Sequence, residues 1–129
     1  MKNLLYLSIA ALFFIACSKD QKAVKNLEGT WTRTGLTHNG VTAIDTSVTT
    51  YAFQTCKVKK GDCPGTMTSD GKGYDFTYNF TDKGEKFTIT LSVLGIPVAN
   101  TGDVVEQTSS KFVFNYQTDS LLIEETLVK

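Results

Sequence analysis

The sequence is poor in the residues and motifs that carry most enzyme chemistry. Its 129 residues include one histidine, His38, and no Gly-x-Ser-x-Gly turn, His-Glu-x-x-His pair or phosphate-binding glycine loop. His38 stands beside Asn39-Gly40, a pair typical of hairpin turns, where a side chain is solvated rather than positioned as a general base. The sequence therefore predicts no catalytic residues, and no cofactor is expected.

A surplus of charge of either sign is also absent. The chain has 13 basic and 13 acidic residues, which give a formal net charge of zero. Because nucleic-acid binding relies on a basic surplus, nucleic acid is excluded as a partner. Glu124 and Glu125 are adjacent in an expected strand, where neighbouring side chains point to opposite faces, so they are not expected to share a site.

No apolar run in the sequence is long enough to remain in a membrane as a helix. A helix needs about 20 apolar residues to cross a bilayer, and the run over residues 4–16 stops short before a polar segment. With Lys2 before it and small residues at its end, this run has the layout of a secretory signal. We predict that residues 1–16 are removed during export.

The end of this signal, Phe14-Ile15-Ala16-Cys17, resembles the lipobox of bacterial lipoproteins. The resemblance implies that Cys17 receives lipid and holds the protein to a membrane, with residues 17–26 forming a lipidated tether and a short helical turn. Because Ser18 replaces the aspartate associated with inner-membrane retention, the bacterial outer membrane is the expected location, on either its periplasmic side or the cell surface. The alternative is a plain signal peptide, in which Cys17 is incidental.

The other two cysteines, Cys56 and Cys63, form an even pair in a chain that is expected to be exported. Such a pair predicts a structural disulfide, here closing a short loop. A zinc site would need two further ligands, and His38 could supply only one. No metal site is therefore predicted, and the spacing is not the Cys-x-x-Cys of thiol oxidoreductases.

After the signal, the apolar pattern has a period of two. Tyr74, Phe76, Tyr78 and Phe80 alternate with polar residues, which places all four aromatic side chains on one face of a strand. Similar alternation continues to the C-terminus, and turn residues separate the runs. The sequence predicts an all-β fold, an antiparallel up-and-down meander of about eight strands that forms a small barrel or strongly curved sheet.

The opening Leu27-Glu28-Gly29-Thr30-Trp31 carries a family resemblance. Gly-x-Trp at the first strand, after a short helical turn, resembles the lipocalins, and residues 27–129 look like the lipocalin-like domain of bacterial lipoproteins. The resemblance implies a barrel in which Gly29 and Trp31 are structural and Trp31 plugs the closed end. The sequence departs from that pattern because no arginine lies near the last strands to stack on Trp31.

The aromatic residues that are expected to point inward leave two functions open. If they line a cavity, the protein is a lipid-anchored envelope protein that binds a small hydrophobic ligand. If they pack a solid core, it is a non-catalytic envelope interaction or assembly protein whose loops, residues 37–43 or 92–103, contact a partner. The residues predicted for a ligand site are Tyr74, Tyr78, Phe87, Phe112 and Tyr116.

Overall fold

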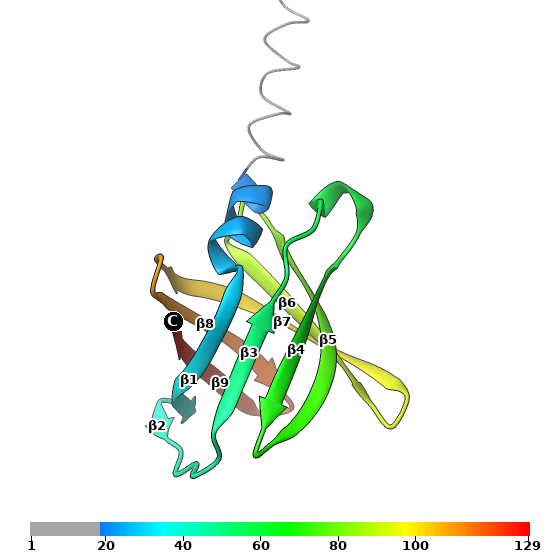
Figure 1. The fold of residues 1–129 in the computed structure, drawn as a ribbon. Helices are drawn as coiled ribbons and strands as arrows, with labels where there is room; N and C mark the ends of the chain where they lie inside the picture. The colour runs from blue at the N-terminus through cyan, green and yellow to red at the C-terminus, as the bar shows by residue number, and fades with distance from the viewer. Residues whose placement is uncertain (1–18) are drawn as a thin grey trace, which may run out of the picture.

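The computed structural model describes residues 19–129, so the predicted signal and Cys17 lie outside the described residues. Within this range the chain forms one helix over residues 19–27, one 3-10 helix and nine strands (Figure 1). The strands and the 3-10 helix are β1 (Gly29–His38), β2 (Val41–Thr42), β3 (Thr49–Phe53), η1 (Val58–Lys60), β4 (Cys63–Ser69), β5 (Lys72–Thr81), β6 (Lys86–Val93), β7 (Ile96–Gln107), β8 (Lys111–Thr118) and β9 (Leu121–Val128).

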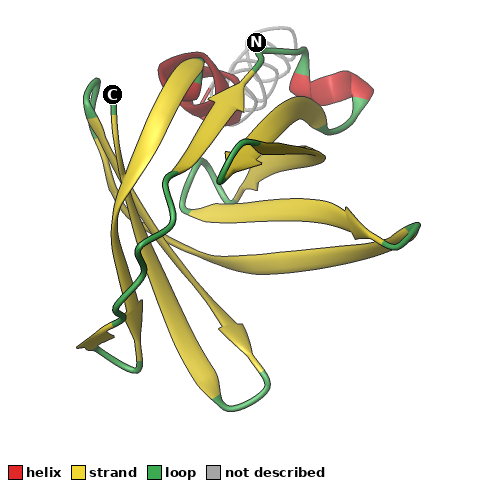
Figure 2. Cartoon of the chain, turned by 60° about the horizontal axis from the view of Figure 1, so that its bottom comes forward, coloured by secondary structure: helices red, strands yellow, loops and turns green. Residues whose placement is uncertain are grey.

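The strands form one closed antiparallel barrel. From β3 to β9 each strand pairs with the next, and β1 pairs with β3 on one side and with β9 on the other. The pairing of β1 with β9 closes eight strands, while the two-residue β2 is an extra strand beside the end of β1. Figure 2 shows the barrel with the end opposite the helix turned forward. The predicted all-β meander is confirmed.

Residues in the left-handed backbone conformation begin the tight turns between several pairs of strands. Asn39, Asp70 and Asp119 have φ values of 51°, 49° and 48°, which asparagine and aspartate tolerate better than other side chains. Each begins the turn between two paired strands, β1 and β2, β4 and β5, or β8 and β9. The turn predicted at Asn39-Gly40 is confirmed, and so are turns between the apolar runs at the other two places.

The helix of residues 19–27 covers one end of the barrel (Figure 1). Its apolar side chains Ala23, Val24 and Leu27 are buried and belong to the barrel core. The sequence pattern predicts a polar tether and a single helical turn here, but the helix is longer and packs on the domain. The reason is that apolar residues at helical spacing complete the core at this end.

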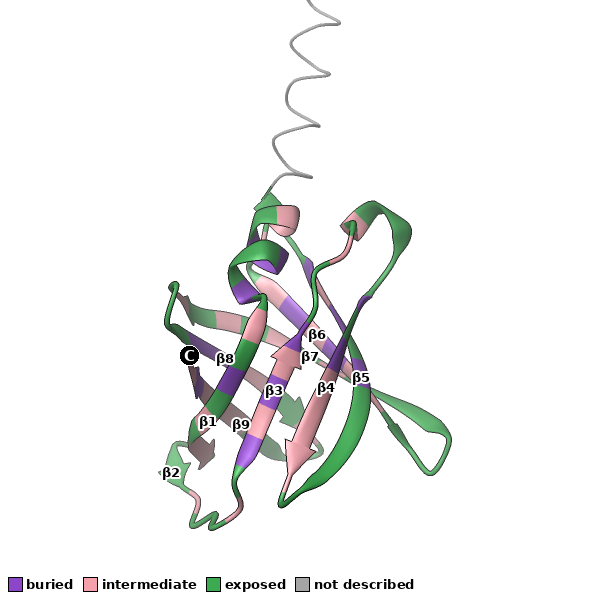
Figure 3. Ribbon diagram, viewed as in Figure 1, coloured by how far each residue is buried: buried purple, intermediate pink, exposed green. Residues whose placement is uncertain are grey.

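Burial follows the period of two along the strands, as the alternating colours of Figure 3 show. Phe76, Phe80, Phe87, Phe112 and Phe114 are all buried, as the alternation predicts. Between residues 19 and 129, no helix has the length and apolar character to cross a bilayer. The core is therefore built by the strands, with the helix as a cover.

Candidate functional site

The interior of the barrel is filled by aromatic rings that touch one another. Phe87 lies at the centre, and five other rings have centroids between 5.0 and 6.4 Å from it, those of Phe53, Tyr78, Phe80, Phe112 and Phe114. Tilted and edge-to-face pairs at these distances are favourable beyond the area that they bury. This packing is the arrangement expected for the solid-core alternative, and ligand binding stays a prediction.

Of the residues predicted for a ligand site, the structure brings three together in this core. Tyr78, Phe87 and Phe112 are buried, and the Tyr78 hydroxyl donates a hydrogen bond to the Gln54 carbonyl at 2.7 Å. Burial raises the pKa of Tyr78 above its ordinary value, with the charge of Glu28 adding to the effect. These side chains therefore contribute to stability through their contacts with one another.

Tyr74 does not join them, and the prediction that it points into the interior is wrong. Its side chain is 43% exposed. The strand β5 pairs with β4 from Lys72 onward, but its pairing with β6 begins only at Phe76. Tyr74 therefore lies on the same face of β5 as the buried Phe76, but on a part of the strand that is not paired with β6.

A polar cluster lies in the interior around Glu125, which is 3% exposed. The hydroxyls of Tyr51 and Tyr116 donate to the two Glu125 carboxylate oxygens at 2.8 and 3.0 Å, and Arg33 donates to one of them at 3.2 Å. Burial, followed by the Glu125 charge, raises the pKa of both tyrosines. Tyr116 is thus a partner of Glu125, not a free ligand-orienting group.

Arg33 also fastens a loop to the barrel. Its guanidinium forms a second ion pair with Asp45, in the irregular segment 43–48 between β2 and β3. Burial, the largest single effect, lowers the pKa of Arg33, but the charge and hydrogen bond of Glu125 together with Tyr51 and Asp45 outweigh it, so the pKa of Arg33 is raised. Hydrogen bonds from Ser47, and then Arg33, lower the pKa of Asp45. A small hollow of about 90 Å³ lies beneath this segment.

No motif in the sequence predicts this cluster, although the alternation of side chains along the strands contains a signal for it. Arg33 has the same parity in β1 as Trp31, and Glu125 has the same parity in β9 as Leu127, so both point inward. Among the described side chains, no buried nitrogen or oxygen lacks a hydrogen-bond partner. Because the polar groups of the cluster bond to one another, its role is structural. It neutralises buried charges and holds the loop of residues 43–48 to the barrel.

The helix end of the barrel is organised around Trp31, which is fully buried. Its indole N–H donates to the Leu27 carbonyl at 2.8 Å, and the Lys129 ammonium lies 5.4 Å from the ring centroid. A lysine from the C-terminus thus stacks on Trp31, where the sequence lacks an arginine. Gly29 has a φ of 119°, and a Cβ there would lie 2.8 Å from Lys129 Cε, so glycine suits this position.

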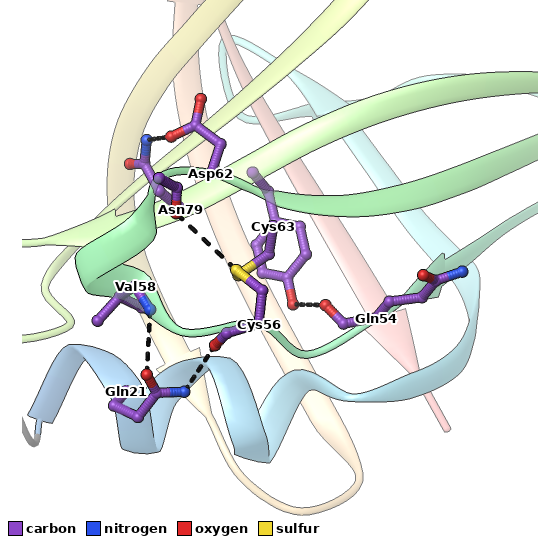
Figure 4. Close-up of a disulfide and its surroundings, with 9 residues drawn as sticks. Gln21, Gln54, Cys56, Val58, Asp62, Cys63 and Asn79 are labelled. Atoms are coloured by element: carbon purple, nitrogen blue, oxygen red, sulfur yellow. Dashed lines mark hydrogen bonds between the residues drawn. A yellow bond between two sulfur atoms is a disulfide. The ribbon is translucent and has the colours of Figure 1, made fainter.

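The predicted disulfide between Cys56 and Cys63 is confirmed, with a Cα–Cα distance of 5.3 Å. It spans the connection from β3 to β4, and Gln21 of the helix holds the same connection (Figure 4). The Gln21 side chain donates to the Cys56 carbonyl at 2.8 Å and accepts from the Val58 N–H at 3.1 Å. No cluster of metal-ligating side chains occurs in the part of the chain that the structure describes.

The connection predicted as a loop over residues 92–103 is instead the end of β6, a two-residue turn and the first part of β7, which together we call the arm. Residues 98–103 of the arm pair with residues 86–91, the barrel part of β6. The pairing of β5 with β6 ends at Leu91, and the pairing of β8 with β7 starts only at Val104. Between these points the described residues form no pairing between the arm and β5 or β8, although a side chain at Gly102 would collide with the Asn115 carbonyl of β8, and the end of the hairpin projects from the barrel (Figure 2). Side chains still alternate between the two faces of the arm, but the apolar ones on the face that continues the barrel core are exposed.

The tip of the arm is apolar and exposed. Val93 and Ile96 are 53% and 66% exposed, and Leu94, between them, is 98% exposed. Leu94 has a φ of 51°, a conformation that the other two-residue turns give to Asn39, Asp70 and Asp119. No charged residue lies between Lys86 and Asp103, which form an ion pair with each other at the start of the β6–β7 hairpin, at the opposite end from its turn. The tip therefore has leucine at a position where the comparable turns of the described chain have asparagine or aspartate.

Comparison with known proteins shows the fold. No family model matches the chain, and no curated protein matches it. A solved structure of a redesigned β-barrel is similar, with a TM-score of 0.53 and 22% sequence identity over 83% of this chain and 94% of that one. The comparison supports a small β-barrel, and the lipocalin-like lipoprotein resemblance stays a prediction.

Proposed function

We propose that this protein is a non-catalytic, lipid-anchored envelope interaction protein, in which a packed barrel presents the arm to a protein partner. The observation that carries the proposal is Leu94, an almost fully exposed leucine in a left-handed turn at the tip of a projecting hairpin. An apolar surface that projects from a folded domain marks a site of interaction. A conformation that costs stability without improving the core points to function.

The packed interior supports the scaffold role. Phe87 and the rings around it pack against one another in the interior, and the Glu125 cluster satisfies its own polar groups. A rigid barrel held by such contacts positions a projecting hairpin reproducibly. The interaction surface then lies on the arm, one of the two segments for which the sequence predicts contact with a partner.

The position of the first described residues supports a lipid-anchored orientation of the barrel. Residue 19 lies at the helix end, and the tip of the arm lies toward the other end of the barrel (Figure 1). A lipid on Cys17 would hold the helix end at the membrane and direct the arm away from it. Replacing Cys17 with serine should abolish lipid labelling and shift the protein out of the membrane fraction. Unchanged labelling would refute the anchor.

The interaction role is tested by a photo-crosslinking amino acid placed at Leu94 of the full chain in intact cells. We expect a discrete covalent adduct after irradiation, because the tip would be buried against its partner. The matched control is the same amino acid at Asp119, which begins another two-residue turn with a positive φ. Absence of an adduct at position 94, or equal adducts at both positions, would contradict the proposal.

A further inference from the structure

From Pro97 to Thr101, the outer edge of β7 carries backbone groups that pair with no strand of the described chain. Val93 and Ile96 flank the two-residue turn and pair with each other, so hydrogen-bonded and non-bonded pairs alternate from there. This alternation turns the backbone N–H and C=O groups of Ala99 and Thr101, and the C=O of Pro97, away from β6. Asp103 continues the series, and its N–H donates outward to Asn115 at 3.1 Å.

We propose that this edge pairs antiparallel with the same edge of a second copy of the chain, about a twofold axis at Ala99. The inference rests on the proposed function, because it takes the arm as the interaction surface and names its partner. In this arrangement the two Ala99 residues exchange N–H···O=C bonds across the axis. Each Thr101 N–H donates to the Pro97 carbonyl of the other copy.

The position of Pro97 favours this register. Proline has no N–H, so it serves an edge only as an acceptor, and here it is opposite the Thr101 N–H donor. Centring the pair on Pro97 would place two prolines together with no donor between them. An edge that pairs with itself meets the requirement of a twofold interface, in which the same surface is used on both copies.

Charge and side-chain pattern agree with a second copy as the occupant. Twofold pairing places like segments together, and the residues between Lys86 and Asp103 carry no charge to repel. Val93, Ile96 and Val98 share one face of the arm, and all are exposed. Pairing joins these faces into one apolar strip. Because the arm has fewer residues than the roughly 20–30 a side of a standard interface, the dimer should be weak and concentration-dependent.

Sedimentation velocity of the full chain in mild detergent, over a dilution series, tests the pairing. We expect a monomer–dimer equilibrium that shifts toward dimer as concentration rises. Ala99→Pro should weaken dimerisation about tenfold or more, because both central N–H···O bonds are lost. Ala99→Val keeps the N–H and should dimerise like the unmodified chain. Circular dichroism confirms that both variants fold.

Cysteine crosslinking gives a second readout of the same axis. Paired Cα atoms at a hydrogen-bonded position lie about 5.5 Å apart, within disulfide reach, so Ala99→Cys should yield a covalent dimer under mild oxidation. Val105→Cys, an exposed position on the barrel part of β7, is the control and should remain largely monomeric. Equal crosslinking at the two positions would refute the twofold axis at Ala99.

The outcomes separate this inference from the function on which it rests. A chain that stays monomeric at every concentration, or an Ala99→Pro variant that dimerises normally, overturns the pairing. If position 94 then still crosslinks to a protein of another mass, the arm remains an interaction surface with a different partner. If position 94 gives no adduct, the proposed function fails as well.

Discussion

The barrel and the arm are built from the same hairpin, yet the two parts treat apolar residues in opposite ways. In the first half of β6, Phe87 and Ile89 are buried, whereas beyond the end of the barrel Val93 and Leu94 are exposed. The difference does not come from side-chain type. It comes from where β5 and β8 stop pairing with the hairpin, which removes the neighbours that would cover its apolar face.

The largest expected effect breaks the barrel side of this comparison. Phe114→Ala should lower the free energy of unfolding by about 3–5 kcal/mol, because the ring is buried against Phe87 and Phe112. Val93→Ala on the arm should cost about 0.5 kcal/mol or less. Thr77→Ala, on the outer face of β5, is a second control in the same range. Chemical denaturation measures all three, and similar losses at Phe114 and Val93 would contradict the comparison.

A slightly smaller effect is expected from the buried polar cluster. Glu125→Leu should destabilise the barrel by about 3 kcal/mol, since it leaves Arg33 without its buried partner and two tyrosine hydroxyls without acceptors. Adding Arg33→Met should recover much of this loss, because the unpaired charge is then removed. Thermal and chemical unfolding of the single and double variants decide the matter. Additive losses would show that Arg33 and Glu125 act independently.

The disulfide should contribute less. Replacing both Cys56 and Cys63 with serine removes the constraint on a short loop, which the chain-entropy relation values at about 2.5 kcal/mol. Gln21 also holds this loop, so the folded structure should be retained. Chemical denaturation of the variant and of the oxidised protein measures this loss in the free energy of unfolding. Recovery of unlinked Cys56 and Cys63 peptides from the exported protein without reduction would contradict the disulfide itself.

The smallest expected effect has the opposite sign and sharpens the arm side. Leu94→Asn should stabilise the protein by about 0.5–1 kcal/mol, because asparagine tolerates the left-handed turn and an exposed leucine contributes no packing. Asp119→Leu makes the reverse change in a comparable turn and should destabilise by a similar amount. If Leu94→Asn destabilises the monomer, the leucine serves the fold and not an interaction.

Much of the fold could be predicted from local pattern. The alternation around Phe76 and Phe114 identifies the strands and their inner faces, and Asn39-Gly40 and Asp70-Gly71 mark turns, because these features depend on neighbouring residues alone. The even cysteine pair likewise predicts the disulfide. The alternation is less complete in β8, where Val113, between Phe112 and Phe114, is also buried.

What could not be predicted depends on where neighbouring strands end. Tyr74 has the parity of a core residue, but its exposure is decided by the start of the β5–β6 pairing, which the sequence of β5 does not contain. The turn at Leu94 carries only Gly95 as a signal and was therefore expected within a longer loop. The Glu125 cluster needs Arg33, from the opposite end of the chain, before its chemistry becomes visible.

The pairing of β1 with β9 determines when the fold can be completed. Arg33 and Glu125, which meet across this pairing, are 92 residues apart in sequence. Contacts between such distant residues form slowly, because a long loop must close first. We expect the barrel to stay open, with β1 unpaired on its β9 side, until β9 has been synthesised. The chain therefore stays largely unfolded while it emerges from the ribosome. If the chain is exported, as we propose, it would pass a translocation channel in this unfolded form, and the barrel would close only after the crossing.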